Sequence, residues 1–173
     1  MLYLQATKKV IVALGLDPNS LGPPGEATAP FGSWIVNLIP IGRRHAYLFV
    51  SCRTLLSFPI MIGKKIPDLQ DLPSFLNHGL VQLGQSLKFS EHNAGRLTSG
   101  LDRIALCVNE DKSLLGIIRA LAADYEHRTK PGDELPGGRL GSIIVAVNST
   151  PRAKLGYKTS VEMALEVLDA SAA

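Results

Sequence analysis

Three charged residues in a row, Glu110, Asp111 and Lys112, form the arrangement in this chain that most resembles catalytic machinery. They follow a predicted strand over residues 103–108, and close charges of this kind can shift the pKa of one carboxylate until it serves as a base. A helix is predicted to begin there, however, and an acidic side chain at a helix start accepts hydrogen bonds from free backbone N–H groups. We therefore interpret Asp111, or alternatively Asn109, as a helix cap and assign no catalytic residue.

A basic turn offers a second kind of chemistry. Arg43 and Arg44 stand between two apolar stretches that predict a hairpin, and Arg53 follows the second stretch. Arginine side chains at one end of a sheet can recognise phosphate or carboxylate groups, whereas a solvated hairpin turn needs no ligand to explain them. The tail holds three further cations, which are Arg152, Lys154 and Lys158. If these six side chains share one face, they favour a nucleic-acid-binding protein.

Trp34 is the only tryptophan in the chain, and it stands at the start of the first apolar stretch. An exposed indole is a stacking platform for a base, while the single tryptophan of a small domain usually belongs to the core. We therefore favour a core position for Trp34 and keep it as a candidate binding residue beside the six cations.

Motifs for metals, phosphate loops and catalytic nucleophiles are absent from the sequence. None of the four histidines stands at ligand spacing from a cysteine or another histidine; they are His45, His78, His92 and His127. No glycine-rich segment leads into the lysine-serine pair of a phosphate loop, and no serine stands in a nucleophile elbow. We expect no metal and no cofactor. Cys52 and Cys107 lie in apolar stretches, so we expect free, buried thiols.

Apolar periodicity predicts the elements that position these residues. The strongest signal is a helix over residues 68–87, whose leucines recur at three-and-four spacing. β-branched and aromatic residues predict strands over 34–39, 46–51 and 54–58, with Pro59 forcing an edge or a bend. The other predictions are a strand over 2–5, a helix from Thr7 to Gly15, a loop over 17–30, a short helix over 91–98, a strand over 103–108 and a helix over 112–127.

The C-terminal part begins with a polar segment, residues 129–138, whose prolines and glycines predict a flexible linker. The apolar run 143–147 is open between strand and helix, because its β-branched residues favour a strand but its length does not decide. Thr159 and Glu162 have the spacing of a capping box, which predicts a final helix. The predicted domains are a core over 1–128, the linker and an extension over 139–173.

The order of the elements, with strands followed by helices, predicts an α+β fold. We expect a small antiparallel sheet packed against several helices, in a single compact domain with the C-terminal extension. A chain of 173 residues can bury a core of this kind without a disulfide or a metal.

Several motifs resemble a family of small bacterial proteins that is known only as a domain of unknown function. The matching segments cover about residues 1–127 and the tail of the longer members; they are 6–9, 14–16, 32–44, 48–50, 54–56, 109–116, 150–151 and 155–157. The chain departs from the family pattern at Ser33, where an acidic residue is usual, and at Ile118 and Arg119, where an Asn-Asp pair is common. The resemblance implies no established activity, cofactor or catalytic residue.

Charge and hydropathy narrow the function classes. The net charge of +3 permits an acidic partner without requiring one. Charges follow a very short apolar run at the N-terminus, and Ser57 and Pro59 interrupt the longest apolar run, so we expect a cytoplasmic protein without a membrane span. Our leading hypothesis is a non-catalytic bacterial protein-interaction or regulatory module that binds a protein partner or itself. The alternatives are a nucleic-acid-binding protein that uses the basic hairpin and the tail, and an uncharacterised enzyme.

Overall fold

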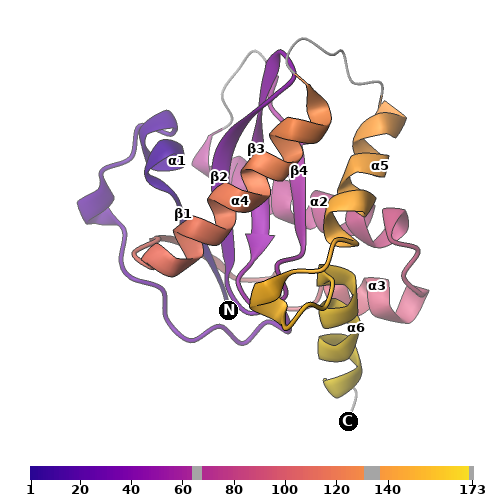
Figure 1. Ribbon diagram of the computed structural model, residues 1–173. Coiled ribbons are helices and arrows are strands. Elements are labelled where there is room, and N and C mark those ends of the chain that lie inside the picture. The colour runs from indigo at the N-terminus through magenta and orange to yellow at the C-terminus, as the bar shows by residue number, and fades with distance from the viewer. Residues whose placement is uncertain (64–67, 131–136, 172–173) are drawn as a thin grey trace.

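One mixed sheet organises the molecule. The computed structural model describes residues 1–63, 68–130 and 137–171, and its five strands lie in the order β4-β3-β2-β1-β5 (Figure 1). The strands are β1 (Leu2–Ala6), β2 (Trp34–Ile41), β3 (Arg44–Ser51), β4 (Ser57–Met61) and β5 (Ile104–Val108). The α-helices of the described residues are α1 (Lys8–Ala13), α2 (Leu72–Ser86), α3 (Glu91–Leu97), α4 (Lys112–Thr129), α5 (Gly137–Asn148) and α6 (Ser160–Ala170). These elements confirm the α+β prediction.

The predicted hairpin is present and longer than its apolar stretches. β2 and β3 pair antiparallel from Trp34 opposite Ser51 to Ile41 opposite Arg44, so the ladder runs into the basic turn. The turn has only two residues, and Gly42 adopts a positive φ of 57° there. Two-residue hairpin turns need this left-handed backbone, which glycine adopts without steric cost.

The third antiparallel strand was predicted over 54–58, and it begins instead at Ser57. The Ser51 hydroxyl accepts a hydrogen bond from Thr54 N at 3.1 Å, and Leu55 has a φ of 57°, so these residues form the turn into β4. Local hydrogen bonding by the hydroxyl therefore outweighs the strand propensity of Thr54. Pro59 lies in β4 at the edge of the sheet, as predicted, where its missing N–H breaks no ladder.

β1 makes the sheet mixed, because it lies between β2 and β5 and pairs parallel with both. Thr7 stands at the N-cap of α1, as predicted, but its side chain does not cap the helix. Its hydroxyl donates instead to Asn37 Oδ1 at 2.9 Å, which ties the start of α1 to β2. Gly15, with a φ of 65°, follows the end of α1 and matches the predicted stop.

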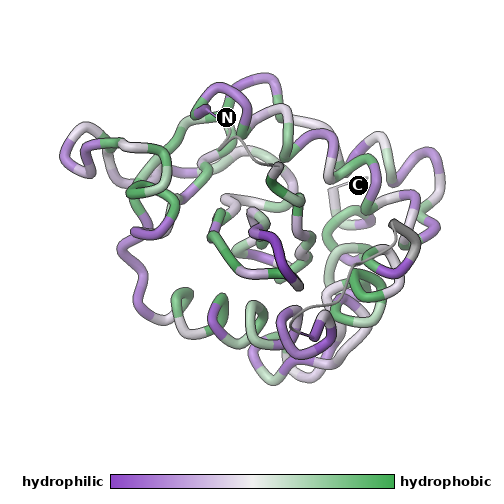
Figure 2. Tube along the Cα trace, turned by 90° about the horizontal axis from the view of Figure 1, so that it is seen from above, coloured by the Kyte–Doolittle hydropathy of each residue, from purple (hydrophilic) through white to green (hydrophobic). Residues whose placement is uncertain are grey.

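Helices cover both faces of the sheet. One face packs against side chains of α1, α2, α3 and α6, and the other packs against α4 and α5. Figure 1 shows α4 in front of the strands and α2 behind them, and Figure 2 looks down on the strands enclosed by the surrounding chain. Leu76 and Leu80 of α2 are 0% and 1% exposed and lie in the same cluster as Phe58, which confirms that this helix faces the sheet.

The apolar run 143–147, left open by the sequence, is helical. It lies inside α5, where Ile143 and Val147 stand one turn apart and are buried against the sheet. Burial of this stripe outweighs the strand preference of β-branched residues. The capping box of Thr159 and Glu162 starts α6 as predicted. Residues 131–136 of the predicted linker lie outside the described residues.

Candidate functional site

A groove opens at the hairpin end of the sheet, on the face that α1 and α2 cover. Its volume is about 710 Å³, within the range of about 300–1,000 Å³ that is usual for small-molecule sites. It is lined by Ala13, Leu38, Arg43, Arg44, His45, Tyr47, Ile62 and Gly63. We call this site the hairpin groove.

Strand register gathers the lining residues on one face. Leu38 pairs with Tyr47 across β2 and β3, and His45 stands two residues from Tyr47 on the same face of β3. Past the end of β4, Ile62 N donates a hydrogen bond to the His45 carbonyl at 2.9 Å, which holds Ile62 against the hairpin. The groove therefore has apolar walls close to a cationic turn.

Arg43, Arg44 and His45 form the rim of the hairpin groove, and all three are exposed. No ion pair among the described residues includes any of them. The two guanidinium groups thus keep their full charge and their hydrogen-bond donors available to an anion.

Among the described residues of the lining, only Tyr47 is fully buried, with 0% of its surface exposed. Its hydroxyl has no hydrogen-bond partner among the residues the structure describes. Burial raises the pKa of this phenol above its ordinary value, so the hydroxyl is neutral at physiological pH and keeps its proton to donate. An unpaired buried hydroxyl typically costs about 1–3 kcal/mol, which a ligand with an acceptor atom would relieve.

The sequence analysis grouped Arg53 with Arg43 and Arg44 in one cationic patch, but Arg53 lies at the opposite end of β3. It follows Ser51, and eight strand residues separate it from the turn, a length of about 26 Å. Its Nη1 donates to the Pro30 carbonyl at 3.0 Å and so holds the preceding loop. The structure therefore brings Arg43 and Arg44 together and leaves Arg53 apart from them.

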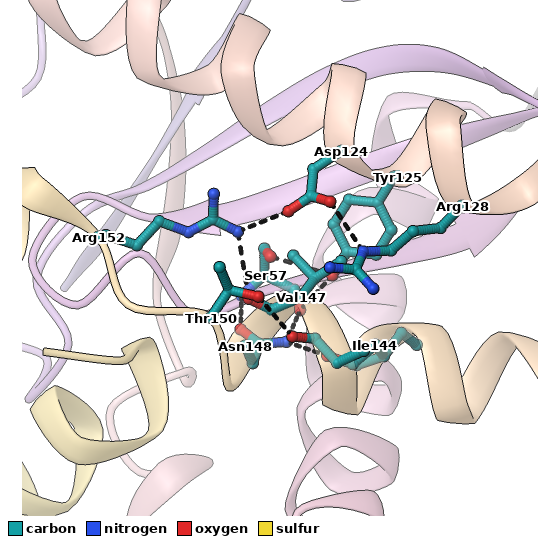
Figure 3. Close-up of polar contacts among 10 residues, drawn as sticks. Ser57, Asp124, Tyr125, Arg128, Ile144, Val147, Asn148, Thr150 and Arg152 are labelled. Carbon is teal, nitrogen blue, oxygen red and sulfur yellow. Dashed lines mark hydrogen bonds and ion pairs between the residues drawn. The ribbon is translucent and has the colours of Figure 1, made fainter. Parts of the chain in front are cut away.

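The three tail cations lie in one short segment, in which Arg152 and Lys158 form an isolated antiparallel bridge, but their side chains do not act together. Arg152 donates through Nη2 to Asp124 Oδ2 at 2.9 Å and to the Val147 carbonyl at 3.1 Å (Figure 3). Lys158 pairs with Glu166 at 2.7 Å on the surface, and Lys154 is exposed. None of the three lines the hairpin groove.

Trp34 occupies the core. It is 1% exposed, and its ring centroid lies 5.9 Å from that of Phe58 in a tilted contact. Its neighbours leave no indole face open for stacking on a base. The position corresponds to the core alternative of the sequence analysis.

The carboxylates after β5 have the capping geometry that the sequence favoured. Asp111 Oδ1 accepts hydrogen bonds from Ser113 N at 2.8 Å, Leu114 N at 3.3 Å and Ser113 Oγ at 2.8 Å. These bonds lower the pKa of Asp111, the one from the Ser113 side chain most of all. A general base for neutral pH needs the opposite shift, so Asp111 serves the helix start rather than proton transfer.

Comparison with known proteins identifies the family. The model of a family described as domain of unknown function DUF6933 matches residues 3–163. The chain belongs to the DUF6933 family. No curated protein and no solved structure matches it. The family segment reaches from β1 into α6 and thus includes both the hairpin groove and the tail cations.

A second polar cluster of this DUF6933 protein joins α4 and α5 to the edge strand β4 (Figure 3). Asn148 Oδ1 accepts from Ser57 N at 2.9 Å, and Asn148 Nδ2 donates to the Ser57 carbonyl at 2.8 Å. Tyr125 Oη donates to the same carbonyl at 3.0 Å and lies 3.0 Å from Ser57 Oγ. The Asn148 amide thereby takes the place of a neighbouring strand, and we call this cluster the edge clasp. The sequence patterns predicted no hydrogen bonds among these residues.

The thiols of the DUF6933 chain show no sign of activation. Both cysteines are free; Cys107 is buried and Cys52 is half-buried. Burial raises the pKa of Cys52 to about 12 and that of Cys107 to about 11, so both are protonated at neutral pH. Within the described part of the chain, no group of three His, Cys, Asp or Glu residues could hold a metal ion. No helix there has the length and apolar character to cross a membrane.

Proposed function

We propose that this DUF6933 protein is a non-catalytic interaction or regulatory module that recognises an anionic group of its partner at the hairpin groove. A cytoplasmic location is part of this proposal. The observation that supports it is the convergence, in one groove, of two arginines and a buried hydroxyl that have no ion-pair or hydrogen-bond partner among the residues the structure describes. Free hydrogen-bond donors and positive charge are what the binding of an anion requires.

The two alternatives have weaker support. A nucleic-acid interface would gain from six cations on one face, but Arg53 holds a loop at the far end of the sheet and Arg152 is bound to Asp124. An enzyme would need a group with a pKa tuned for proton transfer or a reactive nucleophile. The pKa values of Asp111 and of both thiols are shifted in the directions that oppose those roles.

Affinity purification from the native cells with variants tests the proposal. The double variant Arg43→Ala/Arg44→Ala removes the rim charge, and Lys112→Ala/Arg119→Ala removes the same charge from exposed positions on α4 at the other face. We expect one partner to remain bound to the wild type and to the α4 variant, to be lost from the rim variant, and to be recovered chemically unchanged. Equal retention of the partner by both double variants would contradict the proposal. If the molecule lost selectively from the rim variant is a nucleic acid, the nucleic-acid-binding alternative would hold instead.

A further inference from the structure

We infer that the ligand of the hairpin groove is a small organic monocarboxylate with an apolar body, which receives a hydrogen bond from the Tyr47 hydroxyl. This inference rests on the proposed function, because it identifies the partner as a free acid whose carboxylate is the anionic group that the same groove recognises.

The backbone around the groove favours a carboxylate over a phosphate. Arg43 and Arg44 offer planar, bidentate donors on the exposed rim, and both carboxylates and phosphates match that geometry. Phosphate sites in proteins usually add a cradle of backbone N–H groups at a glycine-rich loop or a helix start. Among the described lining residues, the only one in a helix is Ala13, the last residue of α1, and this end of a helix offers no row of free N–H groups.

The apolar walls of the groove favour a ligand whose remaining part is apolar. Leu38 and, to a smaller extent, Ile62 present apolar surface, and free energy is gained when an apolar body displaces water from it. The groove has the volume of a small-molecule site, so a free acid fits it as a whole.

Tyr47 distinguishes this groove from an ordinary charged turn. Four buried side-chain polar atoms of the described residues lack a partner, and they are Tyr47 Oη, Asn109 Nδ2, Arg152 Nε and Ser160 Oγ. Of these, only Tyr47 belongs to the lining of the hairpin groove. A ligand oxygen at hydrogen-bond distance would complete this hydroxyl, and the apolar surroundings would strengthen the bond.

Calorimetric titration of the full chain with octanoate tests the inference, with octanol, inorganic phosphate and a peptide ending in leucine as comparison ligands. We expect octanoate to bind and octanol and phosphate to bind at least about tenfold more weakly, because only octanoate offers both a carboxylate and an apolar body. Tyr47→Phe should weaken octanoate at least about tenfold while leaving the thermal unfolding midpoint unchanged or raised. Arg43→Ala/Arg44→Ala should abolish binding, and Lys112→Ala/Arg119→Ala should not affect it.

The outcomes separate this inference from the proposed function. Octanoate binding that is equal in wild type and Tyr47→Phe would overturn the role of the hydroxyl. Binding of phosphate or of the peptide in preference to octanoate, or of none of the probes, would overturn the ligand class. In each of these cases the proposed function stands if the native partner is still lost from the rim variant, and it falls only if that loss does not occur.

Discussion

Two fully buried tyrosines, Tyr47 and Tyr125, lie in opposite situations within the same small protein. Tyr125 Oη is within 3.0 Å of both the carbonyl and the hydroxyl of Ser57, in the edge clasp. Tyr47 Oη has no partner among the described residues, and Tyr47 is one of the residues that line a groove with a cationic rim. A buried polar group that is fully bonded holds a fold together, whereas an unbonded one beside unpaired charge is available for a ligand. We therefore assign the edge clasp to stability and the hairpin groove to recognition.

The edge clasp is the region where a substitution should cost the most. Asn148→Ala removes the acceptor of Ser57 N, which is left buried and unpaired, and it removes packing at a fully buried position. We expect a loss of about 2–4 kcal/mol in the free energy of unfolding. Urea denaturation measures it, with exposed Gln82→Ala on α2 as the control, for which a change within about 0.5 kcal/mol is expected. A loss below about 1 kcal/mol for Asn148→Ala would show that α5 is not held through this amide.

Low pH should lower the stability of the region around the edge clasp, because Asp124 stands next to Tyr125 on α4. Burial acts to raise the pKa of Asp124, but hydrogen bonds from Arg128 and Arg152 outweigh it and lower the pKa below its usual value. A carboxylate with a lowered folded pKa contributes stability above its unfolded pKa of about 3.9 and loses it as the pH falls through the folded pKa. We expect a loss of about 1–2 kcal/mol from this group between pH 5 and strongly acidic pH.

The measurement for Asp124 is urea denaturation at a series of pH values. Asp124→Asn should be less stable at pH 7 and should show a shallower loss in acid, while Asp102→Asn, at an exposed position, should follow the wild type. Parallel pH curves for wild type and Asp124→Asn would mean that the ion pairs do not persist in solution.

The rim of the hairpin groove should show the smallest effect on folding. Arg43→Ala/Arg44→Ala removes exposed charges that take no part in an ion pair of the described residues, so the free energy of unfolding should change by less than about 0.5 kcal/mol. Thermal unfolding of this variant beside the wild type checks the expectation. A loss above about 1 kcal/mol would give the two arginines a structural role and would remove the contrast between the two regions.

The sequence predicted the elements that local patterns determine. No distant contact was needed to recognise three of them. They are the three-and-four leucine spacing of α2, the hairpin around Arg43 and the capping box at Thr159. The parallel insertion of β1 between β2 and β5 depends on pairing far along the chain, and the helical state of residues 143–147 depends on the sheet that buries them. Local propensity contains neither kind of information.

The candidate site was predicted in part for the same reason. The positive charges of Arg43 and Arg44 are evident in the sequence. The length of β3 is enough to explain why Arg53 lies far from them. The missing partner of the Tyr47 hydroxyl is a property of the packed structure. The sequence of a strand does not show whether the hydroxyl of a tyrosine in it has a hydrogen-bond partner. The edge clasp was missed because Asn148 bonds to Ser57 across 91 residues of chain.

The matched pair Tyr47→Phe and Tyr125→Phe tests the contrast between the groove and the clasp most directly, because each substitution removes one buried hydroxyl oxygen and nothing else. Urea denaturation without any ligand should show that Tyr125→Phe loses about 1–3 kcal/mol, since Ser57 Oγ is left unpaired, while Tyr47→Phe loses nothing or gains up to about 1 kcal/mol. Equal losses for the two variants would contradict this interpretation, because they would mean that the Tyr47 hydroxyl is bonded in the folded protein and is not reserved for a ligand.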